Sequence, residues 1–403
     1  MKDRYLWIIG GSLLQIFLIQ EAKALGLKTI VSDLNRECVA RDLCDVFVHL
    51  DIFDMRAHVE YLKNSSLNIV GVLAAGIDAP ETMAVMNEYL GIKAISLETA
   101  LLVKNKDRFR LKLKELNYPM PIFKILNKLD IPDLNSALKD MPYPLIVKPT
   151  NNCASRDMKI FHQNSTELQI FIEEKLEIYK TLLIEEMWSG AEQTVECLVD
   201  IDGEFHKGFI TDRSFTFKEG YPIERGLIHP TQLDITKQDK LYSLAKKVAE
   251  DLNIDVGAVK LDTIYTPDGP RIIELTVRHS GGYDSQLLVP KSTGKNILKA
   301  AILTAIGEKF DANLLTNRLN RYGVTGSLWP KAGKIVSITG LEEAKNIEGV
   351  ENIFLAKELG DSVREYTDCA ARVIFIICTG DSLKAAQNSL EKAQNSIKIE
   401  TIL

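Results

Sequence analysis

The sequence predicts a soluble protein of mixed α/β and α+β class. Its 403 residues are enough for two or three domains of ordinary size, and 46% of them are hydrophobic. Short apolar strands alternate with helices over the first hundred residues, which is typical of a doubly wound parallel sheet. Further along the chain, alternating strands flank tight turns, which indicates antiparallel pairing. We therefore expect a parallel α/β lobe followed by mixed α+β units.

The N-terminal region reads as a strand, a glycine turn, a helix and a second strand. The turn Gly10-Gly11-Ser12 lacks the full GxGxxG spacing that seats a pyrophosphate on a helix N-terminus. The pattern therefore favours a Rossmann-like scaffold, with a dinucleotide site as the less favoured alternative. The expected strands are 5–9, 28–32, 46–50, 69–74 and 92–95, and the expected helices are 13–25 and 83–90.

The same N-terminal residues also resemble a secretory signal. Lys2 and Arg4 precede an apolar stretch at 6–19, and Ala22-Lys23-Ala24 is similar to a signal-peptidase site. The strand and helix interpretation accounts for more of the residues, so we expect a cytoplasmic protein, with secretion as the minor alternative. The six cysteines are scattered, which suits reduced thiols. No other stretch is long enough to span a membrane, and none is expected to.

The rest of the chain combines helices with short strands. A charged helix is expected at 98–116, ended by Asn117 and the Pro119-Met120-Pro121 breaker. The next expected strands are 122–126, 145–148, 159–162, 182–186, 194–199 and 204–210, with helices at 131–139, 167–179 and 237–252. From about residue 322 we expect a small α+β unit with strands at 334–338 and 372–378 and helices at 341–346 and 382–392.

The charges exclude one class of partner. Lys and Arg number 49 and Asp and Glu number 55, and the net charge of -6 comes from interspersed residues rather than a basic arm. Such a chain has no general attraction for the phosphodiester backbone. We therefore expect no nucleic-acid partner.

A hairpin at 258–274 carries the most informative side chains. Its strands flank the turn Thr266-Pro-Asp-Gly269, and this register places Asp262 opposite residues 273 and 274. Period-two alternation puts Glu274, Thr276 and Arg278 on one face. Two carboxylates beside a guanidinium suit Mg²⁺ bound together with substrate phosphates. A charged surface hairpin is the alternative interpretation.

Two lysines and an acidic segment extend this pattern. Lysine is the ordinary point-charge partner of phosphate oxygens. Lys148 ends an apolar strand, where folding needs no charge, whereas Lys106 on a charged helix would by default be solvated. A strand that leaves its edge at residues 186–188 offers free backbone groups of the kind that adenine recognition requires, and carboxylates nearby can accept hydrogen bonds from ribose hydroxyls. Taken alone, this segment is also compatible with an ordinary strand and loop.

The order of these pieces resembles the ATP-grasp superfamily. The two lysines, the segment at 185–192, the acidic hairpin with its arginine, and Ser280-Gly281-Gly282 follow one another at similar spacing. The resemblance covers nearly the whole chain and implies three domains. They are a Rossmann-like pre-ATP-grasp domain at 1–97, an ATP-grasp domain at 98–316 and an α+β domain at 317–403 similar to that of L-amino-acid ligases.

The resemblance implies a role for each residue. ATP would contact Lys106, Lys148, Ser155, Glu185, Glu186, Met187, Trp188 and Glu192, with the backbone of Glu186 and Trp188 at the adenine. Asp262, Glu274 and Thr276 would bind Mg²⁺ or Mn²⁺, and Arg278 would be the catalytic residue that stabilises the transferring phosphoryl group. Ser280, Gly281 and Gly282 would line the carboxylate substrate.

The implied reaction is phosphorylation of a carboxylate by ATP, followed by attack of an amine on the acyl phosphate. Small-molecule carboxylates and amines are the implied partners, and a homodimer is among the assemblies that the resemblance allows. Phosphoribosylglycinamide synthetase-like ligation is the second candidate, and biotin carboxylase-like proteins share the scaffold.

Three departures from the family pattern favour a further alternative, a non-catalytic ATP-binding sensor. Thr276 replaces the usual Asn, and the loop at 151–157 has no glycine and carries Asp157 beside the expected phosphates, where Arg156 would offset its charge. Relatives often have Gly-His-x-x-Pro where this chain has Gly226-Leu-Ile-His229-Pro230.

Overall fold

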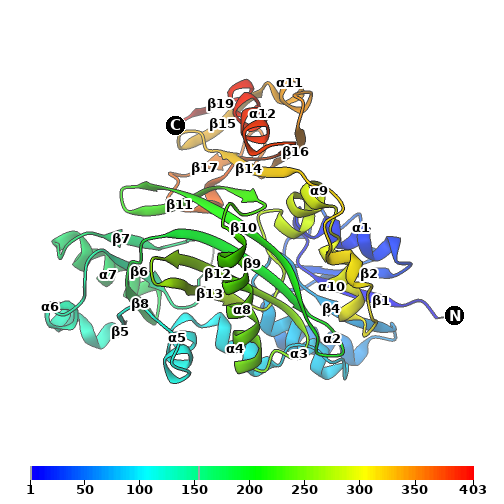
Figure 1. The fold of residues 1–403 in the computed structure, drawn as a ribbon, viewed down its shortest axis with the longest axis horizontal. Coiled ribbons are helices and arrows are strands. Elements are labelled where there is room, and N and C mark those ends of the chain that lie inside the picture. The colour runs from blue at the N-terminus through cyan, green and yellow to red at the C-terminus, as the bar shows by residue number, and fades with distance from the viewer. Residues whose placement is uncertain (1, 153–154) are drawn as a thin grey trace.

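The structure, a computed structural model, describes residues 2–152 and 155–403 and contains four sheets (Figure 1). Cys153 and Ala154, which belong to the glycine-poor loop discussed above, lie outside the described residues. The mixed α/β and α+β class is confirmed. Among the helices that the structure describes, none is both long and apolar enough to cross a membrane.

The N-terminal lobe is the predicted parallel sheet. Its strands are β1 (Tyr5–Ile9), β2 (Lys28–Asp33), β3 (Val46–His49) and β4 (Ile69–Leu73), arranged in the order β3-β2-β1-β4. All three pairings are parallel. The helices of this lobe are α1 (Ile16–Ala24), α2 (Met55–Asn64) and α3 (Pro80–Tyr89). Sequence patterning missed α2.

Both faces of this sheet are buried, as its unbroken apolar strands require. Trp7 and Ile9 belong to the large core that also contains residues of α2, α3 and the main sheet. Leu6 and Ile8 point the other way, into a second core. That second core includes residues of α10 (Ile297–Ala305), a helix much later in the chain. The N-terminal lobe is therefore packed against the central part of the chain through both faces.

The strand predicted at 92–95 does not form. Gly91 has a φ of +69° and turns the chain at the end of α3, so that the next residues run irregularly to Ser96. The Ser96 hydroxyl accepts a hydrogen bond from the backbone of Thr99 and caps α4 (Leu97–Lys104). The apolar residues at 92–95 therefore lead into a helix instead of extending the sheet.

The helix predicted at 98–116 is divided into α4 and α5 (Lys106–Glu115). Asn105 between them is extended, with ψ 103°, and its side chain donates to Leu101 O at 2.7 Å. Asparagine competes with helical backbone bonding in this way. The amide of Lys106 is thereby released and donates to Thr150 O at 2.8 Å. This break places Lys106 at the start of α5, next to the strand that carries Lys148.

A small antiparallel sheet follows, with the order β5-β8-β6-β7. Its strands are β5 (Phe123–Asn127), β6 (Leu145–Pro149), β7 (Lys159–Phe161) and β8 (Thr181–Glu186), with α7 (Thr166–Ile178) contributing to its core. The helix predicted at 131–139 is instead a 3₁₀ turn, η1 (Lys128–Asp133), followed by the short α6 (Leu134–Leu138). Pro132 lies inside η1 and cannot donate a helical hydrogen bond.

An eight-stranded sheet forms the centre of the molecule, in the order β13-β12-β9-β10-β11-β14-β18-β16. Its strands are β9 (Ala191–Val199), β10 (Phe205–Lys218), β11 (Tyr221–His229), β12 (Gly257–Thr266), β13 (Gly269–Thr276), β14 (Tyr322–Leu328), β16 (Val350–Leu355) and β18 (Ile374–Gly380). Helix α8 (Ile235–Asp251) packs on it through the large core. The sheet crosses the predicted boundary at 316/317, and the three-domain partition stays a prediction.

The remaining elements belong to the C-terminal unit and to the segment of the chain that leads into it (Figure 1, yellow to red). A three-stranded sheet has the order β17-β15-β19. The elements are η2 (Asp284–Leu288), α9 (Val289–Thr293), η3 (Ala312–Leu315), β15 (Gly333–Thr339), α11 (Leu341–Lys345), β17 (Ser362–Val363), η4 (Cys369–Ala371), α12 (Leu383–Ser396) and β19 (Lys398–Ile402).

The packing of the N-terminal lobe can be tested at Trp7. Its side chain is fully buried, and Nε1 donates to Ser32 Oγ at 3.0 Å. We expect Trp7→Ala to lower the free energy of unfolding by about 3–5 kcal/mol, because it removes a large buried ring and leaves a cavity. Urea denaturation measures this loss. Leu34→Ala, at a side chain that is 59% exposed, is the control, and an equal effect of both changes would contradict the assignment of Trp7 to the core.

Candidate functional site

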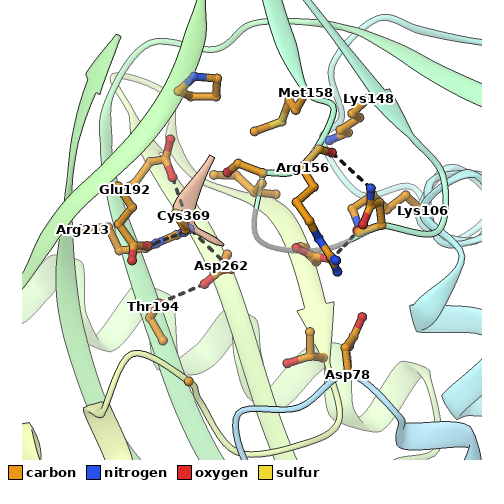
Figure 2. A pocket seen from close by; sticks show the side chains of 18 of the residues that line it. Asp78, Lys106, Lys148, Arg156, Met158, Glu192, Thr194, Arg213, Asp262 and Cys369 are labelled. Atoms are coloured by element: carbon orange, nitrogen blue, oxygen red, sulfur yellow. Dashed lines mark hydrogen bonds and ion pairs between the residues drawn. The ribbon is translucent and has the colours of Figure 1, made fainter. Parts of the chain in front are cut away.

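A cavity of about 570 Å³ lies between the N-terminal lobe, the small sheet and the eight-stranded sheet. Every site residue predicted from the sequence lines it, namely Lys106, Lys148, Ser155, Glu185, Glu186, Met187, Trp188, Glu192, Asp262, Glu274, Thr276, Arg278, Ser280, Gly281 and Gly282. Figure 2 shows Lys106, Lys148 and Arg156 on one side and Glu192, Arg213 and Asp262 on the other. The residues are therefore brought together, while their individual roles stay predictions.

The predicted register of the acidic hairpin is confirmed. Strands β12 and β13 pair antiparallel, with Asp262 opposite Glu274 and Lys260 opposite Thr276. On its other side β12 pairs with β9, which places Thr194 opposite Asp262. Because cross-strand neighbours share a face, one patch of the sheet presents all these side chains to the cavity.

Asp262 is the most heavily stabilised carboxylate of this patch. Its Oδ1 accepts from Lys260 Nζ at 2.6 Å and from Thr194 Oγ1 at 2.9 Å, and its Oδ2 lies 3.4 Å from Arg213 Nη1. Burial alone would raise its pKa, but Arg213 and Lys260 hold the pKa of Asp262 well below its ordinary value. Asp262 is therefore ionised at neutral pH.

Glu274 and Lys106 form an ion pair across the cavity, with Nζ and Oε1 2.8 Å apart. Lys106 also donates to Asn152 O at 2.6 Å. Burial raises the pKa of Glu274, whereas Lys106 lowers it, and the net shift is downward. The lysine on the charged helix is thus directed into the cavity rather than into solvent.

Thr276 at the end of β13 and Arg278 two residues later each have a buried polar atom without a hydrogen-bond partner among the described residues. Thr276 is 7% exposed, and its Oγ1 has no hydrogen-bond partner among the described residues. Arg278 Nε makes no hydrogen bond within the described part of the chain, and its carboxylate neighbour Asp78 lies 4.0 Å away. Buried polar atoms are normally bonded, so these two indicate a place for ligand atoms.

Lys148 is held by a buried network. Its Nζ pairs with Glu185, whose other oxygen binds Arg110 Nε. Arg110 also donates to Ile272 O at 3.1 Å and Ile273 O at 2.9 Å, which joins α5 to β13. Burial would raise the pKa of Glu185, but Arg110 and Lys148 lower it to about 2. The Glu185 carboxylate is therefore engaged in positioning Lys148.

The segment proposed for adenine leaves the sheet as predicted. The amide of Glu186 donates to Ile122 O at 2.9 Å, and that of Met187 donates to Pro144 O at 2.8 Å. The amide of Ile122 donates to the Glu186 carboxylate at 3.1 Å instead of to its carbonyl. The Glu186 carbonyl and the Trp188 amide therefore stay the backbone groups that are predicted to contact adenine.

Sequence reasoning missed a charged cluster beside Glu192. Arg213 on β10 donates to Glu224 on β11 at 2.8 Å and lies 3.4 Å from Glu192 Oε2. Glu224 also accepts from Arg372, which comes from the C-terminal unit, at 3.2 Å. Burial raises the pKa of Glu192, while Arg213 lowers it, and the net shift is upward.

The loop expected to line the carboxylate is fixed by Glu196. This residue is 1% exposed, and its Oε2 accepts from the amide of Ser280 at 2.8 Å and from the Ser280 hydroxyl. Its Oε1 lies 2.8 Å from His279 Nδ1. The amide of Gly76 donates to His279 O at 2.9 Å, which ties the loop to the N-terminal lobe.

The loop at 151–157 differs from expectation at Asp157. Its carboxylate accepts from Lys175 Nζ and from the Tyr179 hydroxyl, each at 2.5 Å, and it does not line the cavity. Burial would raise the pKa of Asp157, but these two partners hold it below its ordinary value. The negative charge that was expected beside the phosphates is therefore neutralised outside the cavity, whereas Ser155 and Arg156 line it.

Some of the missed residues had a detectable signal. Lys260 precedes Asp262 by two positions on one strand, and Arg110 follows Lys106 by four on one helix, so periodicity places each on the functional face. Arg213, Glu224 and Arg372 come from segments without any recognisable motif. Only the pairing of β10 with β11 and the approach of the C-terminal unit bring them to the cavity.

The donor set fits a cation that shares its ligands with a phosphate chain. Within residues 2–152 and 155–403 no group of three His, Cys, Asp or Glu side chains could hold a metal by itself. Asp262 and Glu274 supply two ionised oxygen donors, and the unpartnered Thr276 Oγ1 supplies a neutral one. Hard oxygen donors in this number suit Mg²⁺ that keeps positions for water and phosphate oxygens.

Comparison with known families and structures agrees with this arrangement. The ATP-grasp domain family matches residues 103–282, and the family described as L-amino acid ligase C-terminal domain 2 matches residues 327–401. An L-arginine-specific L-amino acid ligase from Bacillus subtilis is 24% identical over 353 residues, covering 83% of this chain and 82% of that protein.

Two solved structures are similar over the full length of both chains. The L-amino acid ligase from Bacillus licheniformis has a TM-score of 0.84 at 21% identity. The phosphoribosylglycinamide synthetase from Anaerococcus prevotii has a TM-score of 0.77 at 20% identity. Each match covers 100% of this chain and 100% of the chain of the solved structure. The chain therefore contains an ATP-grasp domain, followed by a C-terminal domain of the L-amino acid ligase type.

Proposed function

We propose that this protein is an ADP-forming ligase that activates the carboxylate of an amino acid as an acyl phosphate and transfers the acyl group to an amine. The observation that carries the proposal is the convergence of Asp262, Glu274 and Thr276 with Lys106, Lys148 and Arg278 in one cavity. Support for an amino-acid substrate comes from the C-terminal domain family and from the relative that is named as specific for L-arginine.

In the first step, an oxygen of the substrate carboxylate attacks the γ-phosphorus of ATP, the bond to the β,γ-bridging oxygen breaks, and ADP leaves. Lys148, fixed by Glu185, and Lys106, at the start of α5, are placed to neutralise the phosphate oxygens. Arg278 follows on the same face and would stabilise charge on the transferring group. The cavity acts by positioning and electrostatics, without a protein nucleophile.

In the second step, the lone pair of a neutral amine attacks the acyl carbon, the bond to the phosphate oxygen breaks, and the amine nitrogen loses a proton to the departing phosphate to give the amide. The Ser280–Gly282 loop is fixed by a hydrogen bond from the Ser280 amide to Glu196. The Gly76 amide of the N-terminal lobe donates to the carbonyl of the preceding residue, His279. A Cβ added at Gly76, whose φ is +66°, would lie 2.5 Å from Leu14 Cδ1 and 3.3 Å from Gly281 Cα. Glycine at position 76 therefore allows the N-terminal lobe to approach this loop closely.

Mg²⁺ is the metal that we propose for Asp262, Glu274 and Thr276. When bound, it would neutralise charge on the phosphate oxygens during transfer. Lys260 and Arg213, which contact Asp262, and Lys106, which contacts Glu274, balance these carboxylates within the protein itself. A homodimer and a cytoplasmic location also stay predictions.

The phosphoribosylglycinamide synthetase-like alternative has support from the TM-score of 0.77, but the C-terminal family match favours amino-acid ligation. The sensor alternative rests on Thr276 and on the absence of glycine from the loop at 151–157, and both departures remain. The carboxylate of Asp157 in that loop is directed to Lys175 and Tyr179 instead of to the cavity. Amino-acid ligation is therefore the better supported function.

The test is an ADP-release assay with purified protein, Mg-ATP and L-amino acids, offered singly and in pairs, with mass spectrometry of the products. We expect ADP release that depends on amino acids, together with a dipeptide or another amide. Phosphoribosylamine with glycine tests the second candidate in parallel. ATP binding without turnover of any pair would rule out the ligase and support the sensor.

Thr276→Val separates metal binding from folding. The variant keeps the shape of the side chain and removes a buried hydroxyl that has no partner, so the free energy of unfolding is expected to stay equal or to rise by up to about 1 kcal/mol. Because a neutral oxygen donor is lost, the Mg²⁺ concentration for half-maximal ADP release is expected to rise several-fold. An unchanged Mg²⁺ requirement, with Asp262→Asn as the inactive reference, would remove Thr276 from the metal site.

Glu185→Gln tests the network around Lys148. The variant leaves Arg110 and Lys148 buried without their anion, so we expect a loss of about 3–5 kcal/mol in the free energy of unfolding at pH 7. Glu185 has a pKa lowered from 4.5 to about 2, so its contribution is complete above about pH 4.5 and is lost as the pH falls toward 2. Urea midpoints of both proteins across this range should therefore converge at low pH. Parallel curves would show that Glu185 is not ionised in the fold.

A further inference from the structure

Four residues that line the cavity have a buried polar atom without a hydrogen-bond partner in the described part of the chain. They are Thr276 Oγ1, Arg278 Nε, Asp284 Oδ1 and Arg372 Nε. Two of these atoms belong to guanidinium groups and one to a carboxyl group. The metal and the phosphates account for Thr276 and Arg278 in the proposed reaction, whereas Asp284 has no role in it.

Asp284 is almost completely enclosed, at 2% exposure, and it starts η2 just after the Ser280–Gly282 loop. Gly282 and Tyr283 both have positive φ, 66° and 65°, which turns the chain so that Asp284 joins the lining of the cavity. A non-glycine residue with positive φ is uncommon, and such strain is found where the surrounding structure fixes a functional residue.

Three charged groups and one hydroxyl act on Asp284, each from a different neighbouring strand. Glu196 on β9 and Glu224 on β11 act on it as anions, Lys260 on β12 acts as a cation, and Thr211 on β10 offers a hydroxyl. Each charged neighbour already has a partner of its own. Glu196 pairs with His279, and Glu224 pairs with Arg213 and Arg372. Lys260 pairs with Asp262. Burial, with the two carboxylates, holds the pKa of Asp284 well above its ordinary value.

We infer that Asp284 binds the ammonium group of an amino-acid substrate, an assignment that rests on the proposed ligase function. Asp284 has no ion-pair partner among the described residues, and Glu196 and Glu224 make the field around it more negative. Such a carboxyl group favours a cation as ligand. A substrate carboxylate at the same place would face three acidic groups. The unpartnered guanidinium nitrogens of Arg278 and Arg372 are the better positions for the anionic end of a zwitterion.

This assignment makes Asp284 a specificity residue. The ammonium group of an amino acid would pair with Asp284, and its carboxylate would pair with Arg278 and Arg372. A simple carboxylic acid has no ammonium group and would leave the Asp284 carboxyl without a partner. Sites built to bond a polar group discriminate strongly against analogues that lack it, because a buried protein group then remains unsatisfied. Amino acids should therefore be preferred over their des-amino analogues.

Binding is measured directly, without reliance on turnover. The full-length protein with Mg²⁺ and a non-hydrolysable ATP analogue is screened against the twenty standard L-amino acids by thermal shift, and dissociation constants follow by calorimetry. The variant is Asp284→Asn, which keeps the shape and one acceptor oxygen but cannot ionise. Glu81→Gln is the matched control, because Glu81 is a buried carboxylate that pairs with Lys104 and does not line the cavity.

We expect Asp284→Asn to weaken the binding of the preferred amino acid at least tenfold, with the affinity for the ATP analogue unchanged within twofold. Glu81→Gln should bind like the wild type. The des-amino analogue should bind the wild type at least tenfold more weakly than the amino acid does. Its affinity for Asp284→Asn should equal its affinity for the wild type. If circular dichroism shows that the Asn variant is unfolded, Asp284→Ser takes its place.

Equal amino-acid affinity in the wild type and Asp284→Asn would overturn the assignment, and so would the failure of every amino acid to bind the wild type. The ADP-release assay separates these results from the proposed function. ADP release with carboxylates and amines that are not amino acids would leave ligation standing without this role for Asp284. Amino-acid binding that depends on Asp284, without ADP release from any pair, would contradict ligation alone.

Discussion

The register of β12 between β9 and β13 is the constraint on which the rest of the site depends. It sets Thr194, Asp262 and Glu274 side by side across three strands. A shift of one residue would turn every one of these side chains to the opposite face of the sheet. The buried apolar residues that alternate with them, such as Leu261 and Leu275, oppose that shift because it would place them in the cavity. Core packing and site geometry are thus fixed by the same pairing.

Charge is balanced locally throughout the cavity. Glu185 binds a lysine and an arginine, Glu274 a lysine, and Asp262 a lysine with an arginine nearby. Buried charges are tolerated only when they are paired and bonded in this way. A ligand that carries both phosphates and a cation can replace these ion pairs: its phosphates pair with the lysines and arginines, and its cation pairs with the carboxylates. No charge is then left isolated. Among the buried carboxyl groups of the described residues that line the cavity, Asp284 is the exception, because no cationic side chain forms an ion pair with it.

Local signals in the sequence were sufficient for much of this architecture. Alternation predicted the parallel lobe, and the turn at residues 266–269 predicted the register of Asp262 with Glu274, both of which the structure confirms. The break at Asn105 was missed because the local bond from Asn105 to Leu101 O is joined by a second bond, from the Lys106 amide to Thr150 O, between segments far apart in the chain. The strand at 92–95 was wrong because short apolar runs suit a helix approach equally well. Arg213 and Arg372 reach the site through tertiary packing alone.

The eight-stranded sheet runs from the acidic hairpin into the C-terminal unit through the pairing of β11 with β14. That junction contains two residue pairs, Ile228 with Val324 and His229 with Gly323, yet it leads to the segment from which Arg372 meets Glu224. The C-terminal unit is consequently a wall of the cavity rather than an appendage. Exchange of this unit between relatives would therefore alter ligand selection and the shape of the cavity in a single evolutionary event, while the phosphate-facing residues remained on the unexchanged part of the chain.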